Sequence, residues 1–388
     1  MTCDETLGQR TRGILRAFWR CVLKTENGRG VAMMQTYNRM TDLLNSLPTG
    51  NPLGINFEIQ TAIMRTWGKI HGYQDEERSF TLYPTIMASV SGGSDSDIVI
   101  DLIERIGYPF GNVRYVFFDT GLEFAATKRH LSFLEEKYGI SIERRRAKTP
   151  VPVGVKRCGQ PFLNKRASQY IMRLQKHGFR FRDAPFEKLY AEYPRCKAAL
   201  MWWCNLWGDN SRVNIKRNKW LKEFLIEHPP TFPISDRCCD GAKKATAYEA
   251  EKEIRPDLTV QGVRKSEGGA RATSFKSCFT RVCGGADTLR PIFWFKNEDK
   301  AVYDRVFNIT HSDCYLVYGL RRTGCSCCPF GLDFEDELEA AKRYEPALYK
   351  AAVQVFGESY EYTRLYRAYA QMRNEEAKRG RRGDVDSG

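Results

Sequence analysis

Short apolar runs alternate with amphipathic stretches in one part of the chain. Apolar runs at residues 85–90 and 113–118 are each followed by residues with apolar side chains at helical spacing, 98–106 and 124–138, and residues 140–144 return as a short strand. The resulting order of strand, helix, strand, helix and strand predicts a parallel sheet with right-handed crossovers. The chain is therefore expected to have an α/β core in which ligands bind beyond the carboxyl ends of the strands.

The pattern changes along the chain and predicts five parts. These are a helical N-terminal extension (1–80), a nucleotide-binding α/β core (81–150), a helical, basic and aromatic insertion (151–235), a cysteine-rich part that completes the domain (236–332) and a charged helical C-terminal region (333–388). In the insertion, Trp202, Trp203 and Trp207 lie among Lys and Arg residues, a pattern that suits stacking on nucleotide bases. We favour the simpler interpretation that these tryptophans form a helical core. The basic end of the chain, residues 378–383, is predicted to be disordered.

Composition narrows the class of protein. The chain has 388 residues, 42% hydrophobic and 28% charged, which is typical of a soluble globular protein. No apolar run approaches the roughly 20 residues of a membrane span, and the N-terminus has no signal-peptide core, so we expect a cytoplasmic protein without a membrane partner. The net charge of +14 favours nucleotides or nucleic acid as partners, the alternative being a generally basic surface.

A glycine-rich loop follows the first apolar run and precedes the first amphipathic stretch. A strand, such a loop and a helix N-terminus together can hold phosphate, because glycine lets the backbone turn and unpaired N–H groups face the anion. The loop lacks both the Gly-Lys-Ser/Thr of a P-loop and the G-x-G-x-x-G of a dinucleotide site. Its serines add hydroxyl donors, and Asp95 is placed to face Mg²⁺ or a ribose. The predicted loop consists of Ser91, Gly92, Gly93, Ser94, Asp95 and Ser96.

Two further segments are expected beside this loop. The second apolar run ends in Asp119, Thr120, Gly121, Leu122 and Glu123, at the carboxyl edge of the same sheet. Farther along, residues 262–271 follow a short strand and carry Arg264, Lys265 and Arg271, which can bind phosphate or sulfate oxygens. A solvated basic turn is the alternative.

Thirteen cysteines in a cytosolic chain favour metal or redox chemistry over disulfides. Two separated pairs, Cys238 with Cys239 and Cys325 with Cys328, supply the four thiolates of a Cys₄ site. Adjacent cysteines suit a [4Fe–4S] cluster better than a zinc knuckle, with structural zinc or no metal as alternatives. Further candidate ligands are Cys278, Cys283 and Cys327. Histidine catalysis has little support, and the two histidines in predicted helices, His130 and His177, are expected on helix surfaces.

These motifs resemble a known family. The 91–96 loop is similar to the S-G-G-x-D-S loop of the adenine nucleotide α-hydrolase-like (ATP pyrophosphatase) superfamily, and the 119–123 segment is similar to the D-T-G-x-E segment of phosphoadenosine phosphosulfate (PAPS) reductases. The cysteine pairs resemble the C-C…C-x-x-C set of the adenylyl-sulfate reductase branch. The chain looks closest to phage- and mobile-element-type members, which carry a helical insertion like residues 151–235.

The resemblance implies an enzyme of sulfur metabolism that uses ATP or an adenylyl sulfate such as PAPS. Two reactions fit: sulfonucleotide reduction, and adenylation of an acceptor by ATP followed by sulfur insertion, as in DNA phosphorothioation. No cysteine follows Cys328, where reductases carry a nucleophilic thiol, and this favours adenylation. A reductant or sulfur-donor protein is an expected partner, and a non-catalytic nucleic-acid-binding regulator is the alternative. The implied catalytic residues are Asp95, Arg264 and Arg271, while Lys265 joins the nucleotide-binding set.

Overall fold

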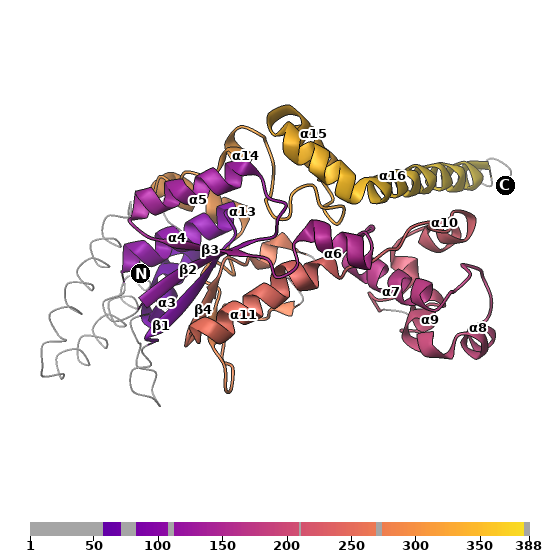
Figure 1. Ribbon diagram of the computed structural model, residues 1–388, viewed down its shortest axis with the longest axis horizontal. Coiled ribbons are helices and arrows are strands. Elements are labelled where there is room, and N and C mark those ends of the chain that lie inside the picture. The colour runs from indigo at the N-terminus through magenta and orange to yellow at the C-terminus, as the bar shows by residue number, and fades with distance from the viewer. Residues whose placement is uncertain (1–56, 71–82, 108–111, 209–210, 269–273, 384–388) are drawn as a thin grey trace, which may run out of the picture.

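Six strands form one sheet in the order β3-β2-β1-β4-β6-β5, and only β5 runs antiparallel to its neighbour (Figure 1). The computed structural model describes residues 57–70, 83–107, 112–208, 211–268 and 274–383. The strands are β1 (Thr85–Val90), β2 (Asn112–Asp119), β3 (Ile142–Arg146), β4 (Leu258–Gln261), β5 (Phe279–Thr280) and β6 (Asp287–Leu289). The predicted α/β fold with a parallel sheet is thus confirmed.

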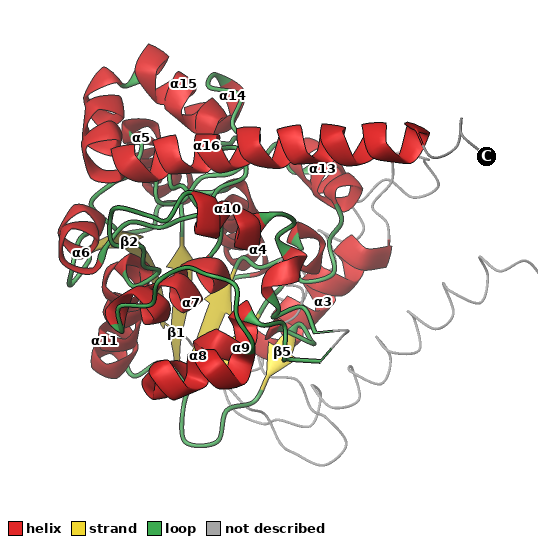
Figure 2. Cartoon of the chain, turned by 90° about the vertical axis from the view of Figure 1, so that its right-hand side faces the viewer, coloured by secondary structure: helices red, strands yellow, loops and turns green. Residues whose placement is uncertain are grey.

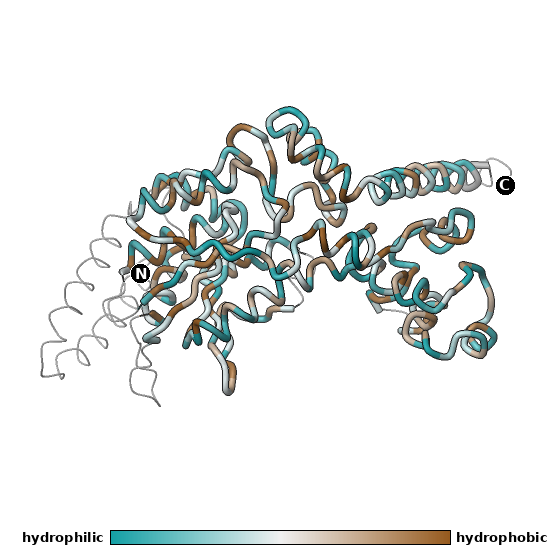
Figure 3. The backbone as a smooth tube through the Cα atoms, in the orientation of Figure 1, coloured by the Kyte–Doolittle hydropathy of each residue, from teal (hydrophilic) through white to brown (hydrophobic). Residues whose placement is uncertain are grey.

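Alternation of side chains along β1 explains the two covered faces of the sheet. Ile86, Ala88 and Val90 face one side and belong to the largest apolar cluster, whereas Met87 faces the other side and packs with Ala250. Since both faces are covered by helices, the central strand β1 is largely apolar, whereas β3 at the edge of the sheet carries Glu143 and three arginines (Figure 3). The apolar pattern of residues 85–90 in the sequence is that of β1.

Helices cover both faces of the sheet. On the face of the largest cluster lie α3 (Phe57–Ile70), α4 (Ser94–Ile106), α5 (Ala125–Tyr138) and α13 (Asn297–Val306). On the opposite face α11 (Ala245–Ile254) packs against β1 and β2. Within the described residues, the predicted N-terminal extension contributes the helix α3. Helical spacing also predicts helices nearer the N-terminus, around residues 13–19 and 40–44, and these segments lie outside the described residues.

A second group of helices stands beside the sheet (Figure 1). It comprises α6 (Val151–Cys158), α7 (Lys165–Lys176), α8 (Phe186–Glu192), α9 (Lys197–Trp203) and α10 (Leu221–Glu227). Trp202 and Trp203 are fully buried in its core, and the Trp203 indole donates to the carbonyl of Arg182 at 3.0 Å. The structural interpretation of these two tryptophans is confirmed, while Trp207 remains 39% exposed.

One long helix, α16 (Pro346–Gly383), connects the two groups (Figure 2). Its Phe356 and Tyr360 pack with the cysteine-rich part, and its Tyr362 and Tyr366 pack into the core that holds Trp202. The helix continues to Gly383, so the prediction of disorder for residues 378–383 is wrong. Favourable packing of its tyrosines along the second group extends the helix into the basic segment.

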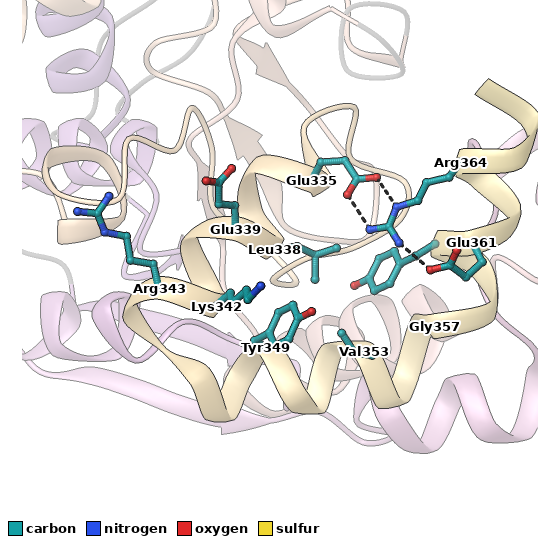
Figure 4. A pocket seen from close by; sticks show the side chains of 11 residues that line it. Glu335, Leu338, Glu339, Lys342, Arg343, Tyr349, Val353, Gly357, Glu361 and Arg364 are labelled. Atoms are coloured by element: carbon teal, nitrogen blue, oxygen red, sulfur yellow. Dashed lines mark hydrogen bonds and ion pairs between the residues drawn. The ribbon is translucent and has the colours of Figure 1, made fainter. Parts of the chain in front are cut away.

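The helix before it, α15 (Phe334–Tyr344), forms a groove with α16 (Figure 4). This cavity of about 720 Å³ is lined largely by charged side chains, and across it Arg364 forms two hydrogen bonds with Glu335, at 3.0 and 2.8 Å. None of the site residues predicted from the sequence lines it. In the described part of the chain, no helix is both long and apolar enough to cross a membrane.

Candidate functional site

The glycine-rich loop joins β1 to α4 at the carboxyl edge of the sheet. Gly92 has a φ of +65°, and a Cβ there would lie 2.5 Å from the Thr127 side chain, so glycine is required. The Ser96 hydroxyl closes the turn by donating to the Gly93 carbonyl at 2.7 Å. Gly93 precedes α4 and supplies no side-chain cap to the helix N-terminus, a position that favours anions.

Polar groups from distant segments converge on Gly93. A Cβ at this position would lie 3.1 Å from both the Ser91 and Thr323 hydroxyl oxygens and 3.2 Å from the Tyr315 hydroxyl oxygen. The Tyr315 oxygen also accepts a hydrogen bond from the Ser94 backbone N–H at 3.2 Å. The absence of a side chain at Gly93 therefore lets the hydroxyl groups of Ser91, Thr323 and Tyr315, which we call the hydroxyl cluster, pack close to the backbone.

Two cations face the acidic residue of the loop. The Arg264 guanidinium lies 2.9 Å from one carboxylate oxygen of Asp95, and the Lys300 ammonium lies 3.3 Å from the other. Lys300 also donates to the Ser94 hydroxyl. Asn297, at the start of α13, accepts from Arg264 at 2.9 Å and fixes its orientation. Both oxygens of Asp95 thus contact protein cations, and its expected contact with Mg²⁺ stays a prediction.

The basic loop after β4 comes very close to the glycine-rich loop. A Cβ on Gly262 would lie 3.1 Å from the Asp95 carbonyl oxygen, so this glycine permits the approach that brings Arg264 to Asp95. Lys265 is different: its ammonium lies 5.0 Å from the centre of the exposed Trp294 ring. Arg271, the third cation expected here, lies outside the described residues.

The segment after β2 turns toward the cysteines. Asp119 pairs with Lys128 at 2.8 Å and accepts from the Gly121 N–H at 2.9 Å. The Thr120 hydroxyl donates to Glu123 at 2.6 Å, and burial raises the pKa of the Glu123 carboxyl to about 7. The backbone of Leu122 accepts from the Ser326 N–H at 2.9 Å. The segment therefore packs on the cysteine-rich loop.

The four cysteines expected to bind a cluster lie near one another. Their thiols interact electrostatically across the two pairs, Cys238 with Cys239 and Cys325 with Cys328. A hydrogen bond between the adjacent thiols raises the pKa of Cys238 and lowers that of Cys239. Burial and the other thiols raise the pKa of Cys328 to about 12.

A lysine accompanies these thiols. Lys243 belongs to a π-helical turn, Asp240–Lys244, that directly follows the first cysteine pair. It interacts with Cys325, Glu123 and Cys239, and these negative partners outweigh burial and raise the pKa of its amine. A Cβ on Gly324 would lie 3.9 Å from its ammonium. Single π-helical turns are frequent at functional sites, because they shift side chains relative to a regular helix.

The donor set fits a four-thiolate centre in type and number. Four thiols from two segments converge, and Lys243 and Lys165 lie close enough to offset the negative charge of thiolates. Within the described ranges, no three His, Cys, Asp or Glu side chains are already arranged round one metal ion. The [4Fe–4S] cluster and its zinc alternative therefore stay predictions.

The additional candidate cysteines point elsewhere. Cys327 has a φ of +57°, and its thiol donates to the Glu337 carbonyl at 3.6 Å, toward α15. Cys278 accepts from Arg65 of α3 at 3.8 Å, and Cys283 is exposed between β5 and β6. The structure therefore separates Cys278 and Cys283 from the converging thiols and turns the Cys327 side chain away from them.

Sequence reasoning missed a buried histidine pair behind the loop. Asp97, fully buried in the first turn of α4, lies 3.0 Å from Nε2 of His130 and 2.8 Å from Nδ1 of His311. His311 also contacts Asp304 at 3.0 Å through Nε2. The expectation that His130 lies on a helix surface is wrong, because this ring is only 5% exposed and pairs with Asp97. No local pattern marks such a contact, since its members are far apart in sequence.

Other missed residues include Lys300, Tyr315 and Thr323. A sequence signal existed only for Thr323, which directly precedes the Gly324 and Cys325 of the cysteine motif. The Thr323 hydroxyl belongs to the hydroxyl cluster at Gly93, whereas Cys325, two residues later, belongs to the converging thiols. The glycine-rich loop and the cysteines are thus neighbouring parts of one region.

Comparison with known proteins gives one family match and several structural likenesses. Residues 85–183 match the phosphoadenosine phosphosulfate reductase domain. Among solved structures, the chain is similar to phosphoadenylyl-sulfate (PAPS) reductase from Candida auris in a phosphate complex, at 13% identity over 62% of this chain and 81% of that one, with a TM-score of 0.34. It is also similar to the U34-tRNA thiolase NcsA from Methanococcus maripaludis with its [4Fe-4S] cluster, at 14% identity over 81% and 80% of the two chains, with a TM-score of 0.34. No curated protein matches the chain.

Proposed function

Since residues 85–183 match the phosphoadenosine phosphosulfate reductase domain, we propose that this chain is a PAPS reductase-like enzyme that uses an adenine nucleotide in sulfur chemistry. One observation carries the proposal: the hydroxyl cluster at Gly93 adjoins Asp95, which contacts Arg264 and Lys300, and Thr323 of the cluster lies two residues before Cys325. Phosphate binding and thiol chemistry are then available in one region.

The first candidate reaction is adenylation by ATP. An acceptor oxygen attacks the α-phosphorus, the bond to the β-phosphate oxygen breaks and pyrophosphate leaves; sulfur from a donor then displaces AMP. The N-terminus of α4 and the 91–96 loop would bind the phosphates. Arg264 and Lys300 would neutralise the charge that develops on the leaving pyrophosphate, and in the absence of nucleotide Asp95 holds both cations at the site.

The cysteines would supply the second half of the chemistry. Cys238, Cys239, Cys325 and Cys328 would hold a [4Fe–4S] cluster, or zinc in the alternative, and such a cluster supplies electrons or a binding position for sulfur. Lys243 and Lys165 would stabilise the thiolate forms of these side chains. Glu123, with a pKa raised to about 7 by burial, is placed to hold or release a proton near Cys325.

Reduction of an adenylyl sulfate is the second candidate reaction. The match to the phosphoadenosine phosphosulfate reductase domain favours it, since that domain is named for this chemistry. The same loop and cations would then bind the phosphate and sulfate groups of the substrate. The two reactions differ in their products, which are pyrophosphate and AMP in one case and sulfite in the other.

Anaerobic assays with ATP and with adenylyl sulfate or PAPS distinguish these reactions. We expect pyrophosphate release from ATP, with losses of about 100-fold or more in kcat/KM for Arg264→Gln and Lys300→Met. Lys350→Met, an exposed lysine on α16, is the matched control and should retain full activity. Sulfite formation instead would establish the second reaction. Failure of the wild-type protein to bind or convert any adenine nucleotide would refute the enzyme proposal and favour a non-catalytic regulator.

A further inference from the structure

Most of the net positive charge of the chain falls in one segment. Residues 151–235 contain sixteen Lys and Arg against six Asp and Glu, a net charge of +10 within a chain whose net charge is +14. Fourteen of the sixteen cations are exposed. The other two, Arg182 and Lys222, are only partly exposed and pair with Glu192 and Asp183. The surface of this segment is therefore strongly electropositive rather than a mixture of both signs.

Part of this charge is gathered on a small surface, which we call the basic ridge. It consists of Arg166 in the first turn of α7 and of four exposed cations in the loop between α9 and α10: Arg212, Lys216, Arg217 and Lys219. Arg166 donates to the Arg212 carbonyl at 3.1 Å, which places the two segments side by side. The ammonium of Lys219 lies 5.1 Å from the centre of the Trp220 ring, and Trp220 donates to Asn374 of α16 at 3.0 Å.

An exposed aromatic ring lies in the same loop. Trp207 is 39% exposed, unlike the buried Trp202 and Trp203, and its backbone N–H donates to Asn214 at 3.0 Å. The Lys216 backbone N–H donates to Asn205 at 3.0 Å, so these contacts fold the aromatic and basic parts of the loop together. Exposed tryptophan among cations suits single-stranded nucleic acid, because bases stack on the ring while cations contact phosphates.

The ridge also adjoins the thiols. Lys165, the residue before Arg166, is exposed and forms a hydrogen bond with Cys239. Lys165 and Arg166 are consecutive residues in the first turn of α7, so the ridge begins next to a residue that contacts the cysteines.

We propose that the basic ridge binds a single strand of DNA or RNA through its phosphodiester backbone and Trp207. The proposal deepens the proposed function and rests on it in one respect: the bound strand is the acceptor that the nucleotide site modifies. The binding itself depends only on the exposed cations and the aromatic ring, so it is measurable without turnover.

Fluorescence anisotropy of the full-length protein tests the binding, with labelled strands of about 20 nucleotides as DNA, as RNA and as duplex DNA. We expect the triple variant Arg166→Gln/Arg212→Gln/Lys216→Gln to raise Kd by about tenfold or more and to reduce the slope of log K against log salt by about 2. Trp207→Ala should weaken single-strand binding by about tenfold and duplex binding much less. Comparison of the DNA and RNA strands shows which sugar is preferred.

The matched control carries the same charge change far from the ridge: Lys342→Gln/Arg343→Gln/Lys350→Gln, three exposed residues of α15 and α16. It should bind like the wild type. Equal weakening by both triple variants would overturn the proposal, because net charge alone would then explain the binding. Absence of oligonucleotide binding, or binding of anionic lipid vesicles in its place, would also overturn it. ATP binding by the ridge variants would show that their nucleotide site is intact. Failure of the ridge proposal is therefore distinguished from failure of the proposed function.

Discussion

Replacing Gly93 by alanine perturbs the proposed phosphate-binding site at the hydroxyl cluster. The backbone at Gly93 is extended, with φ −96° and ψ 155°, so alanine is conformationally acceptable. The new methyl group would lie 3.1 to 3.2 Å from the hydroxyl oxygens of Ser91, Thr323 and Tyr315. These atoms must move by a few tenths of an ångström, which we expect to lower the free energy of unfolding by about 1 kcal/mol.

The effect of the methyl group on nucleotide binding should be larger. The methyl group would lie among the hydroxyl groups of the cluster, which we expect to bind a phosphate oxygen, and would leave them with poorer geometry toward the ligand. Loss of one or two hydrogen bonds to a charged phosphate amounts to about 2–3 kcal/mol, which raises Kd by about 30- to 150-fold. Calorimetric titration with ATP or PAPS measures this change, and thermal unfolding of the same sample measures stability.

Gly357→Ala is the matched control. This glycine lies in α16, and a Cβ added to it would meet no heavy atom within 4 Å, so the substitution should raise helix stability by about 1 kcal/mol and leave nucleotide binding unchanged. A folded Gly93→Ala protein that binds nucleotide with wild-type affinity would refute the proposal that phosphate binds at the hydroxyl cluster.

Three further predictions concern stability. Burial lowers the pKa of His311, but hydrogen bonds with Asp304 and Asp97 outweigh burial and raise the pKa to about 9. Protonated His311 should therefore stabilise the fold by up to about 3 kcal/mol below pH 6.5, and this contribution should be lost as pH rises toward 9. Denaturant titrations of the wild type and of His311→Gln at several pH values measure this difference, and parallel pH profiles of the two proteins would contradict it. Trp203→Ala removes a fully buried ring and should cost about 3–5 kcal/mol in urea unfolding, a value below about 1 kcal/mol indicating that the core is not packed as described. Arg364→Gln breaks a half-exposed pair with Glu335 and should change stability by less than about 1 kcal/mol, which a larger shift in Tm would contradict.

Local patterns made the centre of the fold predictable. The apolar runs of β1 and β2 are continuous because both faces of the sheet are covered, and the glycines of the 91–96 loop mark the turn into α4. Since parallel strands place their carboxyl ends at one edge, the approach of the basic loop to the glycine-rich loop followed from topology. The contact between Arg264 and Asp95 is of this kind.

Contacts between distant segments were not predictable in the same way. His130 and His311 meet Asp97 only after α5 and the segment after α13 pack against α4. A single histidine on an amphipathic helix has the same local pattern whether its ring faces solvent or a buried carboxylate. Lys300 and Tyr315 were missed for the same reason, because each reaches the glycine-rich loop through tertiary packing alone.

Composition was misleading at the end of the chain. The basic residues 378–383 suggested disorder, yet the tyrosines that precede them, Tyr362, Tyr366 and Tyr369, lie on one side of α16 and pack into the core of the second helix group. Their spacing of four and three residues is that of a helix face. The apolar contacts made earlier in the helix therefore decide the conformation of the charged residues that follow.

The same long helix constrains how the site and the basic ridge are related. Tyr360 donates to the carbonyl of Cys327 beside the cysteine motif, and Tyr366, less than two turns later, donates to the carbonyl of Lys219 in the ridge. Because these contacts leave from one continuous helix, the ridge and the cysteine loop are held at a fixed separation by a rigid element.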